Sequence, residues 1–165
     1  MPKLVVLDAD KTIWSHGDIS SCKPPFRRAS ETKIIDSRGE VIELYPGVRR
    51  LLRELKSMRA TLALVTWNMP DPVIEALEKL GIRGCFDFIR AEPHPEKHKM
   101  IASLLEELSK MGVEVKPRDI IYVDDRDLHL PAIVREIGQV RFIHMWVDVK
   151  SHDELLKQIK RELSS

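Results

Sequence analysis

The stretch that decides the fold is Lys3-Leu4-Val5-Val6-Leu7-Asp8-Ala9-Asp10-Lys11-Thr12. An apolar run of strand length ends in two carboxylates, and residues i and i+2 of an extended segment point to the same face. Repulsion between two carboxylates this close raises the pKa of one of them unless a cation lies between them. Asp8 and Asp10 therefore indicate either a metal site or a division between an acid and a base; the alternative is a strand end with two solvated carboxylates.

The rest of the chain alternates between strand-like and helix-like segments. We expect, in order, a hairpin over 33–44, a helix over 48–58, a strand over 61–66, a helix from an Asp71 N-cap through Leu80, a strand over 86–89, a helix from Pro95 to near Gly112, a strand over 119–123, a helix over 130–137, a strand over 140–145 and a helix from Ser151 to 163. Strands that alternate with helices predict an α/β fold, in which a central parallel sheet has helices on both faces.

The length of the chain and its first insertion predict the domain organisation. The 165 residues, 43% of them apolar, are enough for one continuous core, so we expect a single domain over 1–165. Residues 15–45 follow the first carboxylates and hold the predicted hairpin, with a turn around Gly39. We expect this insertion to form a small flap beside the carboxylates.

Composition and charge exclude several classes of function. The net charge is +1, so no overall field favours nucleic acid or a membrane surface, and no segment approaches the roughly 18 apolar residues of a membrane span. Cys22 and Cys85 read as reduced thiols, which makes a disulfide or a zinc site unexpected. The start of the chain has no charged leader with an apolar core, which favours a cytoplasmic protein. Charged residues make up 32% of the chain and amides are scarce, which favours a thermophilic source.

Polar side chains follow four of the predicted parallel strands. They are Asp8 and Asp10 after the first strand, Thr66 after the second, Lys97 or Lys99 after the third, and Asp124 and Asp125 after the fourth. In an open parallel α/β sheet, ligands bind at the carboxyl ends of the strands, so these groups are expected to share one site.

The chemistry of this set is that of phosphoryl transfer. Clustered carboxylates without His or Cys partners suit Mg²⁺, which binds a few carboxylates, waters and substrate phosphate. A carboxylate nucleophile, a cation that reduces its repulsion from phosphate, and a lysine that balances developing charge are together sufficient. The sequence has no Gly-rich phosphate-binding loop of the nucleotide-binding folds.

These motifs resemble the four signature motifs of the haloacid dehalogenase (HAD) superfamily of phosphohydrolases. Within it, the chain is similar to the magnesium-dependent phosphatase-1 group from about Lys3 to Met145. The residues that carry this closer similarity are Trp14, Pro24-Pro25-Phe26, Asp36-Ser37-Arg38-Gly39 and Leu44-Tyr45-Pro46-Gly47-Val48. The resemblance implies a three-layer Rossmann-like fold with a minimal cap.

The resemblance also implies a role for each motif residue. Asp8 would be the nucleophile that becomes an aspartyl phosphate, and Asp10 would protonate the leaving oxygen and then take a proton from water. Thr66 would hydrogen-bond a phosphoryl oxygen, and Lys97 would neutralise charge, with Lys99 as the alternative lysine. The implied Mg²⁺ ligands are Asp8, the Asp10 carbonyl and an acid of the fourth motif. We favour Asp125 as that acid, with Asp124 either ligating through water or orienting the lysine.

Substrate contacts are expected from Thr66, Trp67, Asn68 and Lys97. Trp67 stands where the group often has an arginine that contacts substrate, so substrate preference does not follow from the resemblance. His129 stands where the fourth motif often has Asp or Asn, which leaves the outer metal shell open.

The resulting expectation is a magnesium-dependent phosphatase that hydrolyses phosphomonoesters. Its small flap would leave the site open to phosphoproteins or sugar-phosphate-type substrates. A phosphatase of polynucleotide ends is the first alternative, and a HAD-like binding module without turnover is the second. We expect a phosphorylated small molecule or phosphoprotein as partner, with no membrane and no stable nucleic-acid complex, and the sequence leaves homo-oligomer formation open.

Overall fold

The computed structural model describes residues 3–165 and contains a five-stranded parallel sheet. The strand order is β6-β5-β1-β7-β8. The bounds are Leu4–Leu7 for β1, Thr61–Trp67 for β5, Phe88–Glu92 for β6, Ile120–Asp124 for β7 and Arg141–His144 for β8. The first strand is central, because Leu7 pairs with Leu64 of β5 on one side and with Val123 of β7 on the other.

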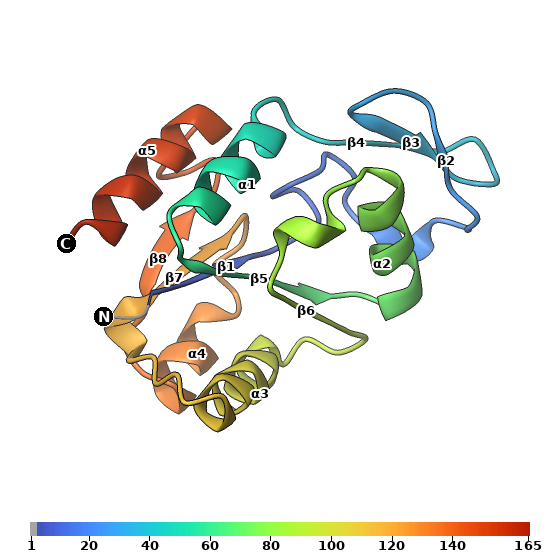
Figure 1. The fold of residues 1–165 in the computed structure, drawn as a ribbon. Helices are drawn as coiled ribbons and strands as arrows, with labels where there is room; N and C mark the ends of the chain where they lie inside the picture. The colour runs from blue at the N-terminus through green and yellow to red at the C-terminus, as the bar shows by residue number, and fades with distance from the viewer. Residues whose placement is uncertain (1–2) are drawn as a thin grey trace.

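Helices cover both faces of this sheet (Figure 1). They are α1 (Val48–Ser57), α2 (Pro70–Lys79), α3 (Lys97–Lys110), α4 (Leu130–Glu136) and α5 (His152–Leu163). Apolar residues of α1, α2 and α5 share one core cluster with Val5 and Leu7, whereas those of α3 and α4 share the other with Leu4 and Val6. The alternation of side chains along a buried parallel strand produces these two cores, and the predicted three-layer α/β fold is confirmed.

The flap is a separate three-stranded antiparallel sheet of β2 (Arg27–Arg28), β3 (Lys33–Ile35) and β4 (Val41–Glu43). The predicted hairpin between β3 and β4 is confirmed. Strand β2 was not predicted, because two residues are too few to form a recognisable strand pattern in the sequence. The carboxylate of Asp36 fixes the turn by accepting hydrogen bonds from three backbone N–H groups. Ile34 and Ile42 belong to the same core cluster as α1 and α2, which anchors the flap to the main sheet.

Two helix starts and one strand differ from expectation. The predicted N-cap role of Asp71 is wrong: α2 begins at Pro70, and Asp71 lies in its first turn. The third helix begins at Lys97 rather than Pro95. Strand β6 lies at Phe88–Glu92, later than the predicted 86–89, because its register pairs Phe88 with Ala63 and Glu92 with Trp67.

The last helix begins as its sequence predicts. The Ser151 hydroxyl accepts a hydrogen bond from the N–H of Glu154 at 3.1 Å. The Glu154 side chain returns to the N–H of Lys150 at 2.7 Å, one residue before the position of a standard capping box. Within residues 3–165, no helix has both the length and the apolar character needed to cross a membrane.

Candidate active site

Four elements bring the predicted polar groups to one edge of the sheet. Asp8 directly follows β1, Thr66 lies near the end of β5, Asp124 ends β7, and Lys97 is the first residue of α3. Parallel strands share their carboxyl ends, so residues up to 116 positions apart in sequence meet there. A hollow of about 220 Å³ lies between them, lined by Asp8, Asp10, Lys11, Gly17, Thr66, Trp67, Lys97, Asp125 and Arg126.

Lys97 is the buried cation of this site. Its Nζ lies 2.6 Å from Asp8 Oδ1 and 2.8 Å from Asp124 Oδ2, and the residue is only 1% exposed. Burial by itself lowers the pKa of the Lys97 ammonium, but the two carboxylates outweigh it and the pKa is raised. Lys99, the alternative, is exposed and pairs with Glu96 at 2.9 Å, so the structure brings Lys97 and not Lys99 into the site.

Asp125 joins the two carboxylates that contact Lys97 to form a cluster of three acids. Oxygens of Asp8, Asp124 and Asp125 lie within 4.8 Å of one another. Burial raises the pKa of Asp8 well above its usual range and also raises that of Asp125. For Asp124, hydrogen bonding and attraction from Lys97 outweigh burial and lower the pKa to about 2.

This charge balance tests whether a metal suits the site. Within residues 3–165, Lys97 is the only cation that forms an ion pair with these three clustered carboxylates. One ammonium cannot balance them, and burial makes the unbalanced charge costly. An all-oxygen donor set of Asp8, Asp124 and Asp125 is the set that a hard divalent cation such as Mg²⁺ prefers. The residues present therefore fit the ion that the sequence predicts.

Thr12 and Tyr122 support these acids, and neither residue had an expected role from the sequence. The Thr12 hydroxyl lies 3.3 Å from Asp8 Oδ2 and 3.4 Å from Asp125 Oδ1. The Tyr122 hydroxyl donates to Asp124 Oδ2 from two residues earlier in β7. Residues i and i+2 of a strand point to the same face, so the sequence could have predicted that Tyr122 lies beside Asp124.

Asp10 is held by three donors. Its Oδ1 accepts from the Trp14 indole N–H at 2.8 Å and from the Ile19 backbone N–H at 3.2 Å. Its Oδ2 accepts from the Asn68 amide at 2.9 Å. These three hydrogen bonds fix the orientation of the Asp10 carboxylate, which lines the hollow. Unlike Asp8, Asp10 is not held by an ion pair with any of residues 3–165.

Asn68 does not have the free amide that a substrate contact requires. It is buried, and its second N–H donates to Thr66 Oγ1 at 2.7 Å, while its carbonyl oxygen accepts from the Ser20 hydroxyl at 2.6 Å. In this structure both amide N–H groups of Asn68 are used to position Asp10 and Thr66. Because Thr66 Oγ1 accepts this hydrogen bond, the Thr66 hydroxyl hydrogen remains available to a ligand.

Two ring N–H groups hold the loop that carries Asp10. The Trp146 indole donates to the Lys11 carbonyl and the His152 imidazole to the Thr12 carbonyl, each at 2.7 Å. Lys11 has a φ of 61°, in the left-handed region that a residue with a side chain rarely adopts. Tyr45 packs against both rings, with centroids 4.7 Å from Trp146 and 5.3 Å from His152. We call Trp146 and His152 the ring clamp; no sequence pattern links them to the loop.

Trp67 and His129 lie at the other side of the hollow. Trp67 is 42% exposed, whereas His129 is buried with its ring centroid 6.4 Å from that of Trp67. Burial and the nearby Lys97 lower the pKa of His129 to about 4, so the imidazole is neutral near pH 7.

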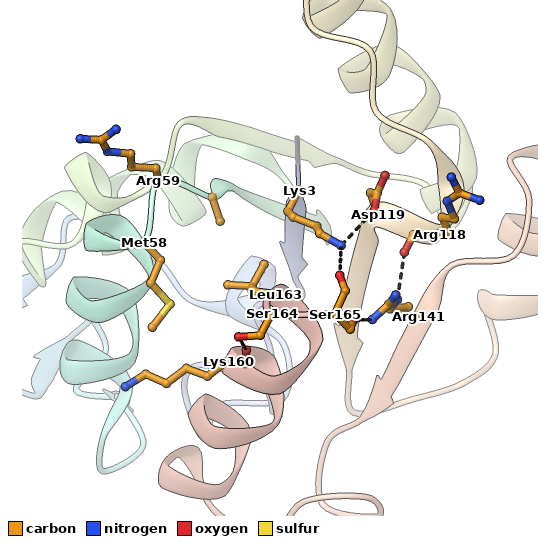
Figure 2. A pocket seen from close by; sticks show the side chains of 11 residues that line it. Lys3, Met58, Arg59, Arg118, Asp119, Arg141, Lys160, Leu163, Ser164 and Ser165 are labelled. Carbon is orange, nitrogen blue, oxygen red and sulfur yellow. Dashed lines mark hydrogen bonds and ion pairs between the residues drawn. The ribbon is translucent and has the colours of Figure 1, made fainter. Parts of the chain in front are cut away.

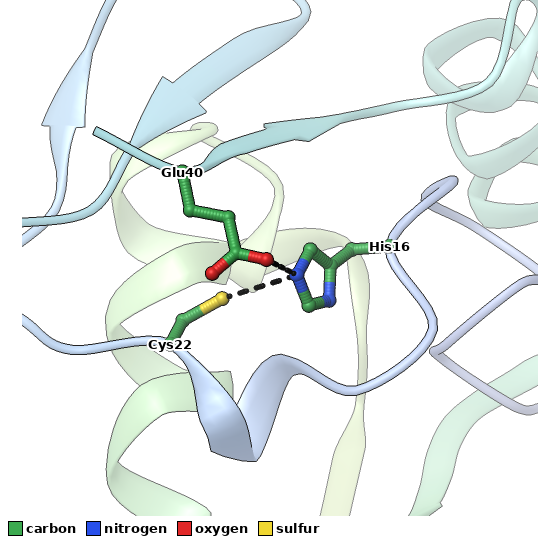
Figure 3. Close-up of side chains that lie close together, drawn as sticks. All are labelled: His16, Cys22 and Glu40. Carbon is green, nitrogen blue, oxygen red and sulfur yellow. Dashed lines mark hydrogen bonds and ion pairs between the residues drawn. The ribbon is translucent and has the colours of Figure 1, made fainter. Parts of the chain in front are cut away.

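His16, Cys22 and Glu40 form a second group of side chains of the metal-ligating types, between the first loop and the flap (Figure 3). His16 Nε2 lies 2.7 Å from Glu40 Oε1 and 3.5 Å from Cys22 Sγ. However, His16 Nδ1 accepts the N–H of Asp18 at 3.0 Å, which uses the single lone pair of a neutral imidazole. Nε2 then carries the proton and donates to Glu40, so the group ties the flap to the loop rather than holding a metal.

A larger cavity, about 1080 Å³, lies at the opposite, amino ends of the strands (Figure 2). Its lining includes Lys3, Arg141 and Lys160, which pair with Asp119, Glu162 and Glu54 at 3.0, 2.6 and 3.0 Å. The carboxyl ends of α1 and α5 also line it, where cations balance the partial negative charge of helix carbonyls. Its basic character is thus explained by the fold, and the polar groups of the strand ends lie elsewhere.

Solved HAD-superfamily hydrolases and phosphatases share the fold of this chain. A predicted phosphatase from Clostridium acetobutylicum superposes with a TM-score of 0.67 at 16% identity, over 98% of this chain and 99% of that one. A HAD-superfamily hydrolase from Geobacter sulfurreducens gives 0.62 at 17%, over 98% and 100%. The 3-deoxy-D-manno-octulosonate 8-phosphate phosphatase from Moraxella catarrhalis, solved with magnesium and phosphate, gives 0.57 at 21%, over 99% and 88%.

Comparison of the sequence with known families and proteins identifies the family of this chain. The family model described as Acid Phosphatase matches residues 1–140, and the chain belongs to this family. Human magnesium-dependent phosphatase 1 is 38% identical over 58 residues, which are 35% of this chain. The match spans about a third, 33%, of the human protein's length.

Proposed function

We propose that the protein is a magnesium-dependent phosphatase that hydrolyses phosphomonoesters through an aspartyl-phosphate intermediate. The observation that carries this proposal is the buried contact of Lys97 with Asp8 and Asp124, at 2.6 and 2.8 Å, in a hollow that Thr66 and Asp10 also line. A carboxylate held by an ammonium at the floor of an acidic hollow suits nucleophilic attack on a phosphoryl group.

In the first proposed step, an Asp8 carboxylate oxygen attacks phosphorus and the ester oxygen leaves, taking a proton from Asp10. In the second step, Asp10 accepts a proton from a water molecule whose oxygen attacks the phosphoaspartate, and inorganic phosphate leaves. Lys97 balances charge on Asp8 and on the phosphoryl oxygens, and the Thr66 hydroxyl donates to one of those oxygens.

The proposed ligands of Mg²⁺ are Asp8, the Asp10 carbonyl and Asp125. Asp124 acts as the neighbour that orients Lys97, in keeping with their 2.8 Å contact. When bound, the ion would supply positive charge that lets the phosphoryl group approach the carboxylates.

We further propose that the substrates are phosphoproteins or sugar-phosphate-type molecules. The polynucleotide-end alternative has less support, because the catalytic hollow is not lined by the basic flap residues Arg27 and Arg28. The Arg28 guanidinium lies instead near Gly81, at the end of α2. The proposal also retains a single domain over 1–165, a cytoplasmic location, a thermophilic source and an open question of self-association.

The test is hydrolysis of 4-nitrophenyl phosphate by the wild type and by Asp8→Asn. We expect wild-type activity to require Mg²⁺ and to disappear in excess chelator, and Asp8→Asn to lose at least about a thousandfold in kcat. Asp71→Asn, an exposed aspartate in the first turn of α2, is the matched control. Undiminished hydrolysis in Asp8→Asn, or in chelator, would show that the mechanism is wrong, and an inactive wild type would favour a binding module.

A further inference from the structure

The catalytic hollow opens on its Asp10 side into a second hollow of about 440 Å³. Asp10, Gly17, Trp67 and Arg126 line both, so the two are continuous. Asp10 is the group proposed to protonate the leaving oxygen. The second hollow is therefore the place where the leaving group of a substrate would lie.

One wall of this leaving-group hollow is apolar. Trp67 and Met69 line it while remaining 42% and 49% exposed, and Pro93 lines it as well. Exposed large apolar side chains beside a polar site leave apolar surface that a ligand can cover. A leaving group with a flat or apolar face would gain from contact with this wall.

The same hollow is lined by Arg126, a cation without an internal partner. Among residues 3–165, no carboxylate forms an ion pair with its guanidinium, although its backbone N–H is fixed by Asp124 Oδ1 at 3.1 Å. The two acids that line the hollow already accept hydrogen bonds: Asp10 from Trp14, Ile19 and Asn68, and Asp18 from the N–H of Ser20. Lys11 and Lys97 line the catalytic hollow but not this one, so Arg126 is the cation that this hollow offers to a substrate.

We propose that the substrate is a phosphomonoester whose leaving group carries a second anionic group, bound by Arg126, beside an apolar face that covers Trp67. This inference rests on the proposed phosphatase function and names the class of substrate for it. A guanidinium suits a carboxylate or a second phosphate, which it binds through paired hydrogen bonds.

The experiment compares phosphate esters in two pairs whose members differ in one charge. The first pair is the phosphate esters of 4-hydroxybenzoate and of its methyl ester, and the second is the corresponding 3-substituted isomers. We expect the wild type to favour a carboxylate isomer over its methyl ester by at least about tenfold in kcat/KM. Arg126→Gln should remove this preference, measured as the ratio of kcat/KM for each carboxylate ester to that for its methyl ester, whatever its effect on the methyl esters themselves. Arg126→Lys should retain part of it, because the charge remains but the paired geometry is lost.

Two further variants separate charge from the apolar wall. Arg135→Gln removes an exposed arginine of α4 that pairs with Glu136, and it should keep the wild-type preference. Trp67→Ala should lower kcat/KM for both esters by a similar factor, since both present the same ring. If no carboxylate isomer is preferred, or if the preference survives in Arg126→Gln, the substrate class is wrong. Hydrolysis of the methyl esters that depends on Asp8 would still uphold the phosphatase itself.

Discussion

At the scale of single residues, two neighbouring acids at the end of β7, Asp124 and Asp125, have different hydrogen-bond partners. Asp124 is buried against Lys97 and Tyr122, whereas Asp125 is partly exposed and lines the hollow. Their divergence follows from the alternation of side chains in an extended segment. The choice between Lys97 and Lys99 required the structure, because only the first turn of α3 decides which ammonium reaches Asp8.

Asn68 gives the prediction that belongs to this scale. Asn68→Ala removes one donor from Asp10 and one from Thr66, so the Asp10 proton is delivered from a less defined position. Because a poor leaving group depends more on protonation, we expect kcat/KM to fall about tenfold more for phenyl phosphate than for 4-nitrophenyl phosphate. Parallel steady-state assays of the two esters give this ratio.

Asn68→Asp is the companion variant, since it keeps the shape but places a carboxylate beside Asp10. It should be at least as defective with phenyl phosphate. Equal losses on both esters in Asn68→Ala would mean that Asn68 supports Thr66 rather than the acid.

At the scale of secondary-structure elements, the loop after β1 depends on the segment that follows β8 and on the first turn of α5. The ring clamp joins Trp146 and His152 to the carbonyls of Lys11 and Thr12. These carbonyls follow Asp10, whose own carbonyl is a proposed Mg²⁺ ligand. The clamp therefore connects the end of the chain to the geometry of the metal site.

Trp146→Phe tests the clamp, because it removes the indole N–H and keeps an aromatic ring against Tyr45. We expect Mg²⁺ to bind about tenfold more weakly, measured by calorimetry, and the free energy of unfolding to fall by about 1–2 kcal/mol from the unsatisfied carbonyl. Trp67→Phe is the matched control, since Trp67 lies at the rim on the far side of Asp10, and it should leave Mg²⁺ affinity unchanged. Wild-type Mg²⁺ affinity in Trp146→Phe would remove the clamp from the account of the metal site.

At the scale of the whole molecule, stability depends on the neutral histidine that α4 places against the site. The pKa of His129 is about 4 in the folded protein and about 6.5 when unfolded. Between these two pH values the unfolded chain binds a proton that the folded protein does not. The contribution of His129 to stability is therefore complete above about pH 6.5 and is lost as the pH falls toward 4.

Urea unfolding at pH 7 and pH 5 measures this dependence. We expect His129 to account for about 1–2 kcal/mol of the stability lost between the two, and His129→Gln to show a correspondingly smaller loss. The stability lost between pH 7 and pH 5 can be compared between the two proteins even if the variant is less stable at both pH values. His94→Gln, which removes a histidine at the surface, is the control; an unchanged loss in His129→Gln would contradict the assignment.

The sequence by itself determined the fold and most of the polar groups that gather at the carboxyl edge of the sheet. Helical and strand periods and breaking residues are local signals, and carboxylates at strand ends must share one edge once the sheet is parallel. Only the tertiary structure decided that Lys97 pairs with Asp8, that Asn68 donates hydrogen bonds to Asp10 and Thr66, and that Trp146 and His152 hold the loop. The physical reason is that each of these is a hydrogen bond or ion pair between distant segments, whose formation depends on packing in three dimensions and leaves no periodic trace in the chain.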